Sequence, residues 1–273
     1  MSVHPIFIGG CPRSGTSALL QVLNSNSSVF ISAEENLLNM EEKLSQLLGS
    51  RERRAEIYTE IGMRELSVRE TMTQKDILSR NFTGLSIWPM ISSLYQWHHC
   101  QVGGEPLQLW GDKFPGYYKD LQRVLSIDGS RYIHITRNPF DVVNSMLRRT
   151  EMAGQGRDWW KAITNVADMV EEWCRAYRAI SQVEMHKNVF HLYYEALVFD
   201  FDLAVKELNS FLEVDLQYDN IMIDGLEYHF DRPYLDRTII NDIMSRVEVK
   251  AYLKNCLNNS SVSNVFLSMN DIH

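Results

Sequence analysis

The chain has 273 residues, of which 45% are hydrophobic and 11% aromatic, and its formal net charge is -8. This composition excludes a largely disordered chain and allows a sizeable core, so we expect a single globular domain over residues 1–273. The acidic balance argues against a nucleic-acid-binding protein, which needs a basic face to collect phosphates.

The cysteines and the apolar stretches indicate the compartment. The cysteines are widely spaced and form no metal-ligand motif, at positions Cys11, Cys100, Cys174 and Cys256. No stretch reaches the roughly 20 apolar residues of a membrane-spanning helix, and the run at residues 5–8 is too short for a signal peptide. We therefore expect a cytoplasmic protein with no metal site and no membrane partner. The sequence gives no indication of its oligomeric state.

The first predicted unit, residues 5–35, contains a strand, a glycine-rich turn, a helix and a second strand. The strands are predicted at residues 6–8 and 29–31, and the helix at residues 18–23. Glu34 and Glu35 come shortly after the second strand. From residue 36 to about residue 100, charged faces alternate with apolar side chains, which predicts an inserted helical layer or lid.

The second predicted unit, residues 105–200, alternates strands and helices. Apolar runs predict strands at residues 107–110, 132–136 and 189–193. Helices are predicted at residues 140–147, with Pro139 in the first turn, and at residues 159–185. This alternation is typical of a mostly parallel sheet with helices on both faces, and so predicts a three-layer α/β fold. Residues 201–273 complete the domain as a C-terminal helical region, with a polar tail after residue 257.

Several chemically capable side chains come just after predicted strands. In chain order they are Arg13, Glu34, Lys113, Arg137 and Tyr194. Ligands of parallel α/β sheets bind at the carboxyl ends of the strands, so these side chains are expected to converge on one crevice.

Residues 10–17 match most of a phosphate-binding P-loop. Gly10 and Gly15 are five residues apart, and Thr16 and Ser17 follow at the start of the helix. Backbone N–H groups in such a turn point at an anion, and the helix dipole adds to the attraction. The lysine that reaches the β and γ phosphates of a nucleoside triphosphate is absent, because Thr16 follows Gly15 directly. The loop therefore favours a single 5′-phosphate with Arg13 as the added charge, the alternative being a plain glycine turn.

These residues resemble the PAPS-dependent sulfotransferase superfamily, in the branch with protein-tyrosine sulfotransferases and many bacterial enzymes; PAPS is 3′-phosphoadenosine 5′-phosphosulfate. Residues 12–17 are similar to the family's 5′-phosphosulfate loop. Arg137, with Ser145 eight residues later, is similar to its 3′-phosphate site, and residues 194–197 to its segment near the adenine. The resemblance implies a P-loop-like fold and PAPS as co-substrate. It assigns the cofactor to Arg13, Ser14, Gly15, Thr16, Ser17, Arg137, Ser145 and Tyr194.

The resemblance also implies the reacting groups. Lys113 would contact the bridging oxygen and the sulfonate, Arg13 would add positive charge, and Glu34 would take the proton of the acceptor. An ungapped count from Arg13 selects Glu34, and its neighbour Glu35 is the second choice. The family's basic Arg-Lys-Gly loop is not visible in the C-terminal region.

The sequence does not name the acceptor. The acidic composition favours a neutral or cationic small molecule bound by the helical insertion, with a protein or polysaccharide as the alternative. A nucleotide kinase and a nucleotide-binding module without turnover are the competing functions. The absent P-loop lysine argues against the kinase, and the presence of both Glu34 and Lys113 argues against the module.

Overall fold

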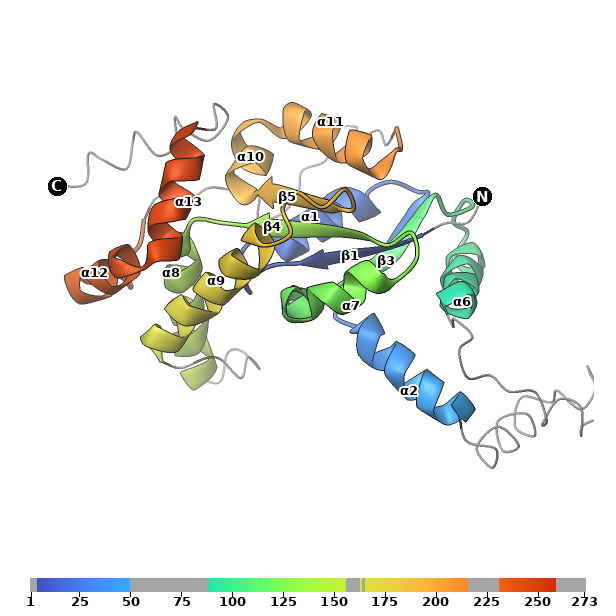
Figure 1. Cartoon of the computed structure of the whole chain (residues 1–273), viewed down its shortest axis with the longest axis horizontal. Helices are drawn as coiled ribbons and strands as arrows, with labels where there is room; N and C mark the ends of the chain where they lie inside the picture. The colour runs from blue at the N-terminus through green and yellow to red at the C-terminus, as the bar shows by residue number, and fades with distance from the viewer. Residues whose placement is uncertain (1–3, 50–87, 156–162, 164, 216–230, 259–273) are drawn as a thin grey trace, which may run out of the picture.

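A parallel five-stranded sheet forms the centre of the molecule within the part of the chain that the structure describes (Figure 1). The computed structural model describes residues 4–49, 88–155, 163, 165–215 and 231–258. The strands are β1 (Pro5–Gly9), β2 (Val29–Ala33), β3 (Leu109–Lys113), β4 (Arg131–Thr136) and β5 (Val189–Tyr193). Their order is β2-β3-β1-β4-β5, and every neighbouring pair is parallel. All five strands therefore end at the same edge of the sheet.

Helices cover both faces of this sheet. One face carries α1 (Thr16–Asn24), α10 (Tyr194–Phe199) and α11 (Phe201–Leu212). The other carries the short helix η1 (Pro115–Asp120) with α7 (Leu121–Ser126), α8 (Pro139–Gly154) and α9 (Val166–Ser181), and also α6 (Trp88–Gln101), α12 (Arg237–Ser245) and α13 (Val247–Asn258). Helix α2 (Leu37–Gly49) extends from the edge near α7 in Figure 1. The predicted three-layer α/β fold is confirmed.

The two cores follow from the alternation of side chains along each strand. Ile6 and Ile8 lie in the core under α1, α10 and α11, whereas Phe7 between them lies in the core of the opposite face. Successive side chains of a strand point to opposite faces, so a strand that is apolar throughout needs cover on both sides. Burial of each such side chain contributes roughly 1.5–3 kcal/mol relative to exposure.

The position of β3 corrects the sequence prediction. The strand begins at Leu109 and ends at Lys113, so Lys113 is its last residue and does not follow it. The apolar pattern ends before Gly111, but the backbone stays extended because β3 lies between β1 and β2. A Cβ atom on Gly111 would lie 1.8 Å from the Ile6 carbonyl oxygen, so only glycine fits this crowded central position.

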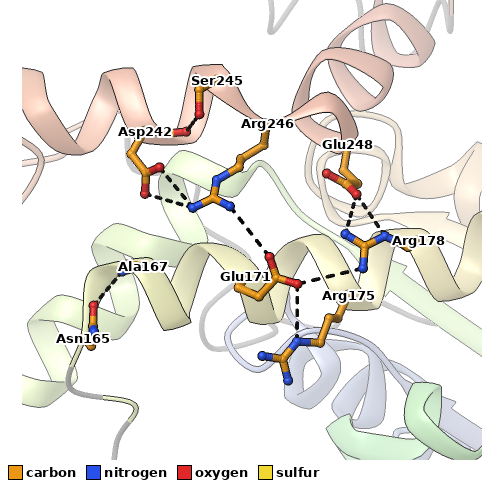
Figure 2. Close-up of polar contacts among 9 residues, drawn as sticks. All are labelled: Asn165, Ala167, Glu171, Arg175, Arg178, Asp242, Ser245, Arg246 and Glu248. Atoms are coloured by element: carbon orange, nitrogen blue, oxygen red, sulfur yellow. Dashed lines mark hydrogen bonds and ion pairs between the residues drawn. The ribbon is translucent and has the colours of Figure 1, made fainter.

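The helix predicted at residues 159–185 is also shorter in the structure. Helix α9 begins at Val166, because the Asn165 side chain caps it by accepting a hydrogen bond from the Ala167 N–H at 2.9 Å (Figure 2). It ends at Ser181, before the predicted end. Residues 159–162 of that prediction lie outside the described residues, as does residue 164. In the helical insertion, α2 and α6 agree with the prediction, and residues 50–87 lie outside the described part.

The C-terminal helices dock on α9 through a network of ion pairs (Figure 2). Arg246 lies between Asp242 on α12, at 3.0 Å, and Glu171 on α9, at 3.8 Å. Arg178 on α9 donates from Nε to Glu248 on α13 at 2.9 Å. Beneath these charges lie buried apolar side chains of α12 and α13, including Ile243, Val249 and Tyr252. Among the described residues, no helix combines the length and the apolar character needed to cross a membrane.

Candidate nucleotide and sulfuryl-transfer site

The loop after β1 has the backbone of an anion cradle. It leads into α1, whose first intrahelical hydrogen bond runs from the Leu19 N–H to the Gly15 carbonyl at 3.0 Å. The N–H groups before Leu19 therefore have no partner within the helix. The first turn of α1 contains no acidic residue, and no side chain caps it. Such a helix start attracts an anion through its N–H groups and its dipole.

Gly15 is required in this loop for two independent reasons. Its φ is +97°, in the left-handed region that favours glycine. A Cβ atom on Gly15 would also lie 2.3 Å from Cδ2 of Tyr194, the first residue of α10. Arg13 in the same loop has a φ of 74°, which is uncommon for a residue with a side chain. This tight turn places Tyr194 directly against the phosphate loop.

The residues predicted for the two phosphates lie together. Arg13 donates from Nε to the Ser145 hydroxyl at 3.1 Å, which joins the loop after β1 to α8. Arg137, directly after β4, places its guanidinium over the Tyr194 ring, with 4.4 Å from Cζ to the ring centroid. Tyr194 is only 1% exposed. Its ring is thus packed beneath Gly15 and Arg137, and the predicted contact with adenine stays a prediction.

The three hydroxyl residues of the loop differ in their surroundings. Ser14 is fully buried, and His134 and Thr136 lie nearby. Its hydroxyl has no hydrogen-bond partner among the described residues. Thr16 is buried as well, whereas Ser17 is exposed at the start of α1. Of these side chains, Ser17 is therefore the one most open to a ligand from solvent.

Lys113 and Glu34 meet at the ends of β3 and β2. The Lys113 ammonium lies 2.7 Å from Oε1 of Glu34, and the Glu34 N–H donates to the Lys113 carbonyl at 2.7 Å. The Lys113 side chain is 4% exposed and that of Glu34 50% exposed. Because Lys113 also pairs with Ile8 of β1, two residues before Gly10, the ion pair lies beside the start of the phosphate loop. One buried cation and one accessible carboxylate are thus held side by side.

The neighbouring Glu35 is placed differently. Its side chain is exposed, as that of Glu34 is, but no contact of its carboxylate with Lys113 is present among the described interactions. Its backbone N–H donates to Oδ1 of Asp112 at 3.2 Å. Between the two candidates for the base, the geometry therefore favours Glu34.

Asp112 fixes this turn, and sequence reasoning did not single it out. Its carboxylate is completely buried and accepts hydrogen bonds from the Ser32 hydroxyl, the Glu35 N–H, the Asn36 N–H and the Tyr117 hydroxyl. Glu34 and Asn36 both have left-handed φ values, of 65° and 52°. The two hydrogen bonds from the Glu35 and Asn36 N–H groups hold the chain in this strained path, which directs Glu34 towards Lys113. An acidic residue inside a buried strand is the signal that could have revealed it.

Burial changes the protonation behaviour of two groups around the site. Burial, followed by the Asp112 carboxylate, raises the pKa of Tyr117 well above its usual range, so Tyr117 remains a hydrogen-bond donor. Burial also raises the pKa of Glu195, the residue after Tyr194, to about 7. In the described part of the chain, no group of three or more His, Cys, Asp or Glu side chains is placed to hold a metal ion.

Comparisons with known proteins identify the family of the chain. A model of the sulfotransferase family matches residues 5–218, which is most of the chain. Structures that resemble it include the sulfotransferase domain of the curacin biosynthetic pathway, at 24% identity over 87% of this chain and 82% of that chain, with a TM-score of 0.48. Another is the sulfotransferase domain of the Synechococcus PCC 7002 olefin synthase, at 22% identity over 88% and 84%, with a TM-score of 0.48.

A third structure, mouse sulfotransferase SULT7A1 complexed with PAP, is 15% identical over 89% of this chain and 64% of that chain, with a TM-score of 0.40. No protein of curated function shows significant sequence similarity to the chain. The residues that the family model matches include the phosphate loop, the Glu34 and Lys113 pair and Arg137. The chain therefore belongs to the sulfotransferase family, the PAPS-dependent enzymes that its phosphate loop resembles.

Proposed function

We propose that this enzyme transfers the sulfuryl group of PAPS to a hydroxyl or amine of a small neutral or cationic acceptor and releases PAP, the 3′,5′-bisphosphate product. The observation that carries the proposal is the ion pair of Lys113 and Glu34, at 2.7 Å, beside a phosphate loop that lacks the P-loop lysine. The pair would supply a cation for the leaving group and a base for the acceptor at one edge of the sheet. Residues 1–273 would act as a single domain.

The residues present fit a nucleotide with separate 5′ and 3′ phosphates. The 5′ side would lie on the N–H groups at the start of α1, where the first turn has no acidic residue. The 3′ side would lie between Arg137 and Ser145, since Arg13 already connects Ser145 with the loop. A guanidinium and a hydroxyl together suit a phosphate, because charge-assisted hydrogen bonds are the strong ones.

Each reacting group has a task that its surroundings support. PAPS, when bound, supplies the sulfuryl group, whose bond to the bridging oxygen breaks as the bond to the acceptor oxygen or nitrogen forms. Glu34 would take the acceptor proton, because its carboxylate is accessible and held in place by the turn on Asp112. Lys113, which is 4% exposed, would offset the negative charge that collects on the bridging oxygen, and a buried cation does so with little rearrangement.

The acceptor would bind against the helical insertion of residues 36–100. Helix α2 begins at Leu37, three residues after Glu34, so the insertion starts beside the proposed base. The net charge of -8 favours a neutral or cationic acceptor over a polyanion. We propose a small molecule and a cytoplasmic location, with a protein or polysaccharide acceptor as the alternative outcome of the test.

Two measurements test the function. Calorimetry should show that PAP binds without a metal and much more tightly than ATP with magnesium, because the loop has no lysine for the β and γ phosphates. A screen of amines, alcohols, peptides and polysaccharides with 35S-labelled PAPS should then show label on a small molecule. The Glu34→Gln variant serves as the inactive control. Tighter binding of ATP than of PAP would contradict the proposal and favour a kinase.

A further inference from the structure

The peptide bond between Arg137 and Asn138 is held at both of its polar atoms by side chains from other elements. The indole N–H of Trp173 on α9 donates to the Arg137 carbonyl at 2.9 Å. The Asn138 N–H donates to Oε1 of Glu195 on α10, also at 2.9 Å. A peptide unit is planar, so holding its carbonyl and its N–H fixes the orientation of the whole plane.

This peptide plane directly follows Arg137 and therefore affects the direction of its side chain. It connects the end of β4 with α8, and Asn138 is the N-cap of α8, since its side chain accepts from the Phe140 N–H at 3.0 Å. Ser145 follows on the same helix. A rotation of the plane would therefore move the side chain of Arg137 relative to Ser145.

Two consecutive residues of α10 hold Arg137 from different sides. The Tyr194 ring contacts the guanidinium at 4.4 Å, and the Glu195 carboxyl holds the backbone that follows Arg137. Glu195 is completely buried, and its second oxygen, Oε2, has no hydrogen-bond partner among the described residues. A buried carboxyl that is only half satisfied costs stability, which is typical of groups kept for the function of a site.

We propose that Glu195 is a positioning residue for recognition of the 3′-phosphate. By holding the Asn138 N–H, it sets Arg137 at the distance from Ser145 at which both contact one phosphate. It thereby sets the preference of the site for nucleotides with a 3′-phosphate over those without one. The inference rests on the proposed function, because that function requires a 3′-phosphorylated nucleotide.

The test compares two nucleotides that differ in the 3′-phosphate, PAP and adenosine 5′-monophosphate, by calorimetry on the full chain. Glu195→Ala should weaken PAP binding by about tenfold and change binding of adenosine 5′-monophosphate by less than about twofold. Glu195→Gln should stay within about threefold of wild type for both, because the glutamine oxygen can still accept from Asn138. Glu195→Asp, one methylene shorter, should behave like the alanine variant.

The matched control is Glu248→Ala, which removes another carboxylate with a long-range hydrogen bond, in this case to Arg178. It should leave the ratio of the two affinities unchanged. Equal weakening of both nucleotides in Glu195→Ala, or no weakening of PAP, would overturn the inference. If the alanine variant does not fold, equal PAP affinities of the aspartate and glutamine variants would overturn it instead. Failure of the wild-type protein to bind PAP would overturn the proposed function itself.

Discussion

The carboxyl edge of the sheet and the C-terminal helix pair both concentrate arginines and carboxylates, but they hold them differently. At the sheet edge, Lys113 is 4% exposed, and its partner Glu34 is fixed through a turn on buried Asp112. On α9, α12 and α13, Arg178 is 50% exposed and pairs with Glu171 and Glu248 across the helix surfaces (Figure 2).

The difference separates charges that we propose to act in the reaction from charges that attach helices. At the sheet edge, the buried charge has lost its hydration. Only specific partners offset that loss, so each partner matters. In the helix pair, Arg178 keeps half of its side chain in contact with water, although Glu248 is 14% exposed, and such a partly exposed ion pair contributes roughly 0–1 kcal/mol. We therefore expect substitutions at the edge to change turnover or nucleotide binding, and substitutions in the helix pair to change stability slightly.

The largest effect is expected for Lys113→Met, which keeps the length of the side chain and removes its charge. Turnover should fall by about 10²–10³-fold, the range for loss of one preorganised charge in the transition state. Labelled PAPS and a saturating acceptor give this number, and the melting temperature is recorded in parallel. A large loss of melting temperature with normal turnover would make Lys113 a structural charge like those of the helix pair.

Glu34→Gln should lower turnover by about 10²-fold or more, because glutamine keeps the shape of the base but cannot accept the acceptor proton. PAP affinity should hardly change. Glu35→Gln is the matched control and should stay active, since its side chain is exposed and away from Lys113. An inactive Glu35 variant together with an active Glu34 variant would reverse the assignment. If both variants stay active, neither residue acts as the base.

Arg137→Ala should weaken PAP binding by roughly 2 kcal/mol or more, about 30-fold, through loss of a charge-assisted contact with the 3′-phosphate. Calorimetry measures it. Binding of adenosine 5′-monophosphate should change much less. Arg178→Ala provides a control from the helix pair and should leave both affinities unchanged. Unchanged PAP binding in a folded Arg137 variant would assign Arg137 to structure.

Stability should depend on pH through Glu195. Burial raises the pKa of its carboxyl to about 7 in the folded chain, from an ordinary value of about 4.5. Between these values the unfolded chain has released the proton while the folded chain keeps it, so stability falls as pH rises through this window and levels off above about pH 7. The fall should be roughly 3 kcal/mol, since a shift of one pKa unit corresponds to about 1.36 kcal/mol. Urea unfolding at several pH values should show it in wild type relative to Glu195→Gln, and parallel curves would contradict it.

The smallest effect is expected in the helix pair itself. Glu248→Ala removes the partner of Arg178 and should cost about 1 kcal/mol or less, a shift of a few degrees in melting temperature. Nucleotide affinity and turnover should remain those of wild type. High salt should reduce the difference between the two proteins, because it screens exposed charges. A loss of PAP binding in this variant would mean that the helix pair also supports the nucleotide site.

Much of the fold and part of the site were predictable from local patterns. The apolar runs of β1, β4 and β5 and the turn between β1 and α1 are contiguous in sequence, and each lies within a few residues of its predicted position. The side chains at the strand ends follow from these runs, because parallel strands end at one edge. The C-terminal helices could be predicted only as a helical region, because exposed ion pairs can form in many arrangements and leave no motif.

The sequence by itself determined the three-layer fold, the phosphate loop without its lysine and the family, since these depend on periodicity and on residues within one turn or strand. Only the tertiary structure decided that Lys113 belongs to β3, that Arg13 contacts Ser145 from 132 residues away, and that Glu34 rather than Glu35 meets Lys113. Likewise only the fold shows the buried partners of Asp112 and Glu195. The physical reason is that a buried polar group takes whichever partner packing brings to it, and that partner can lie anywhere in the chain.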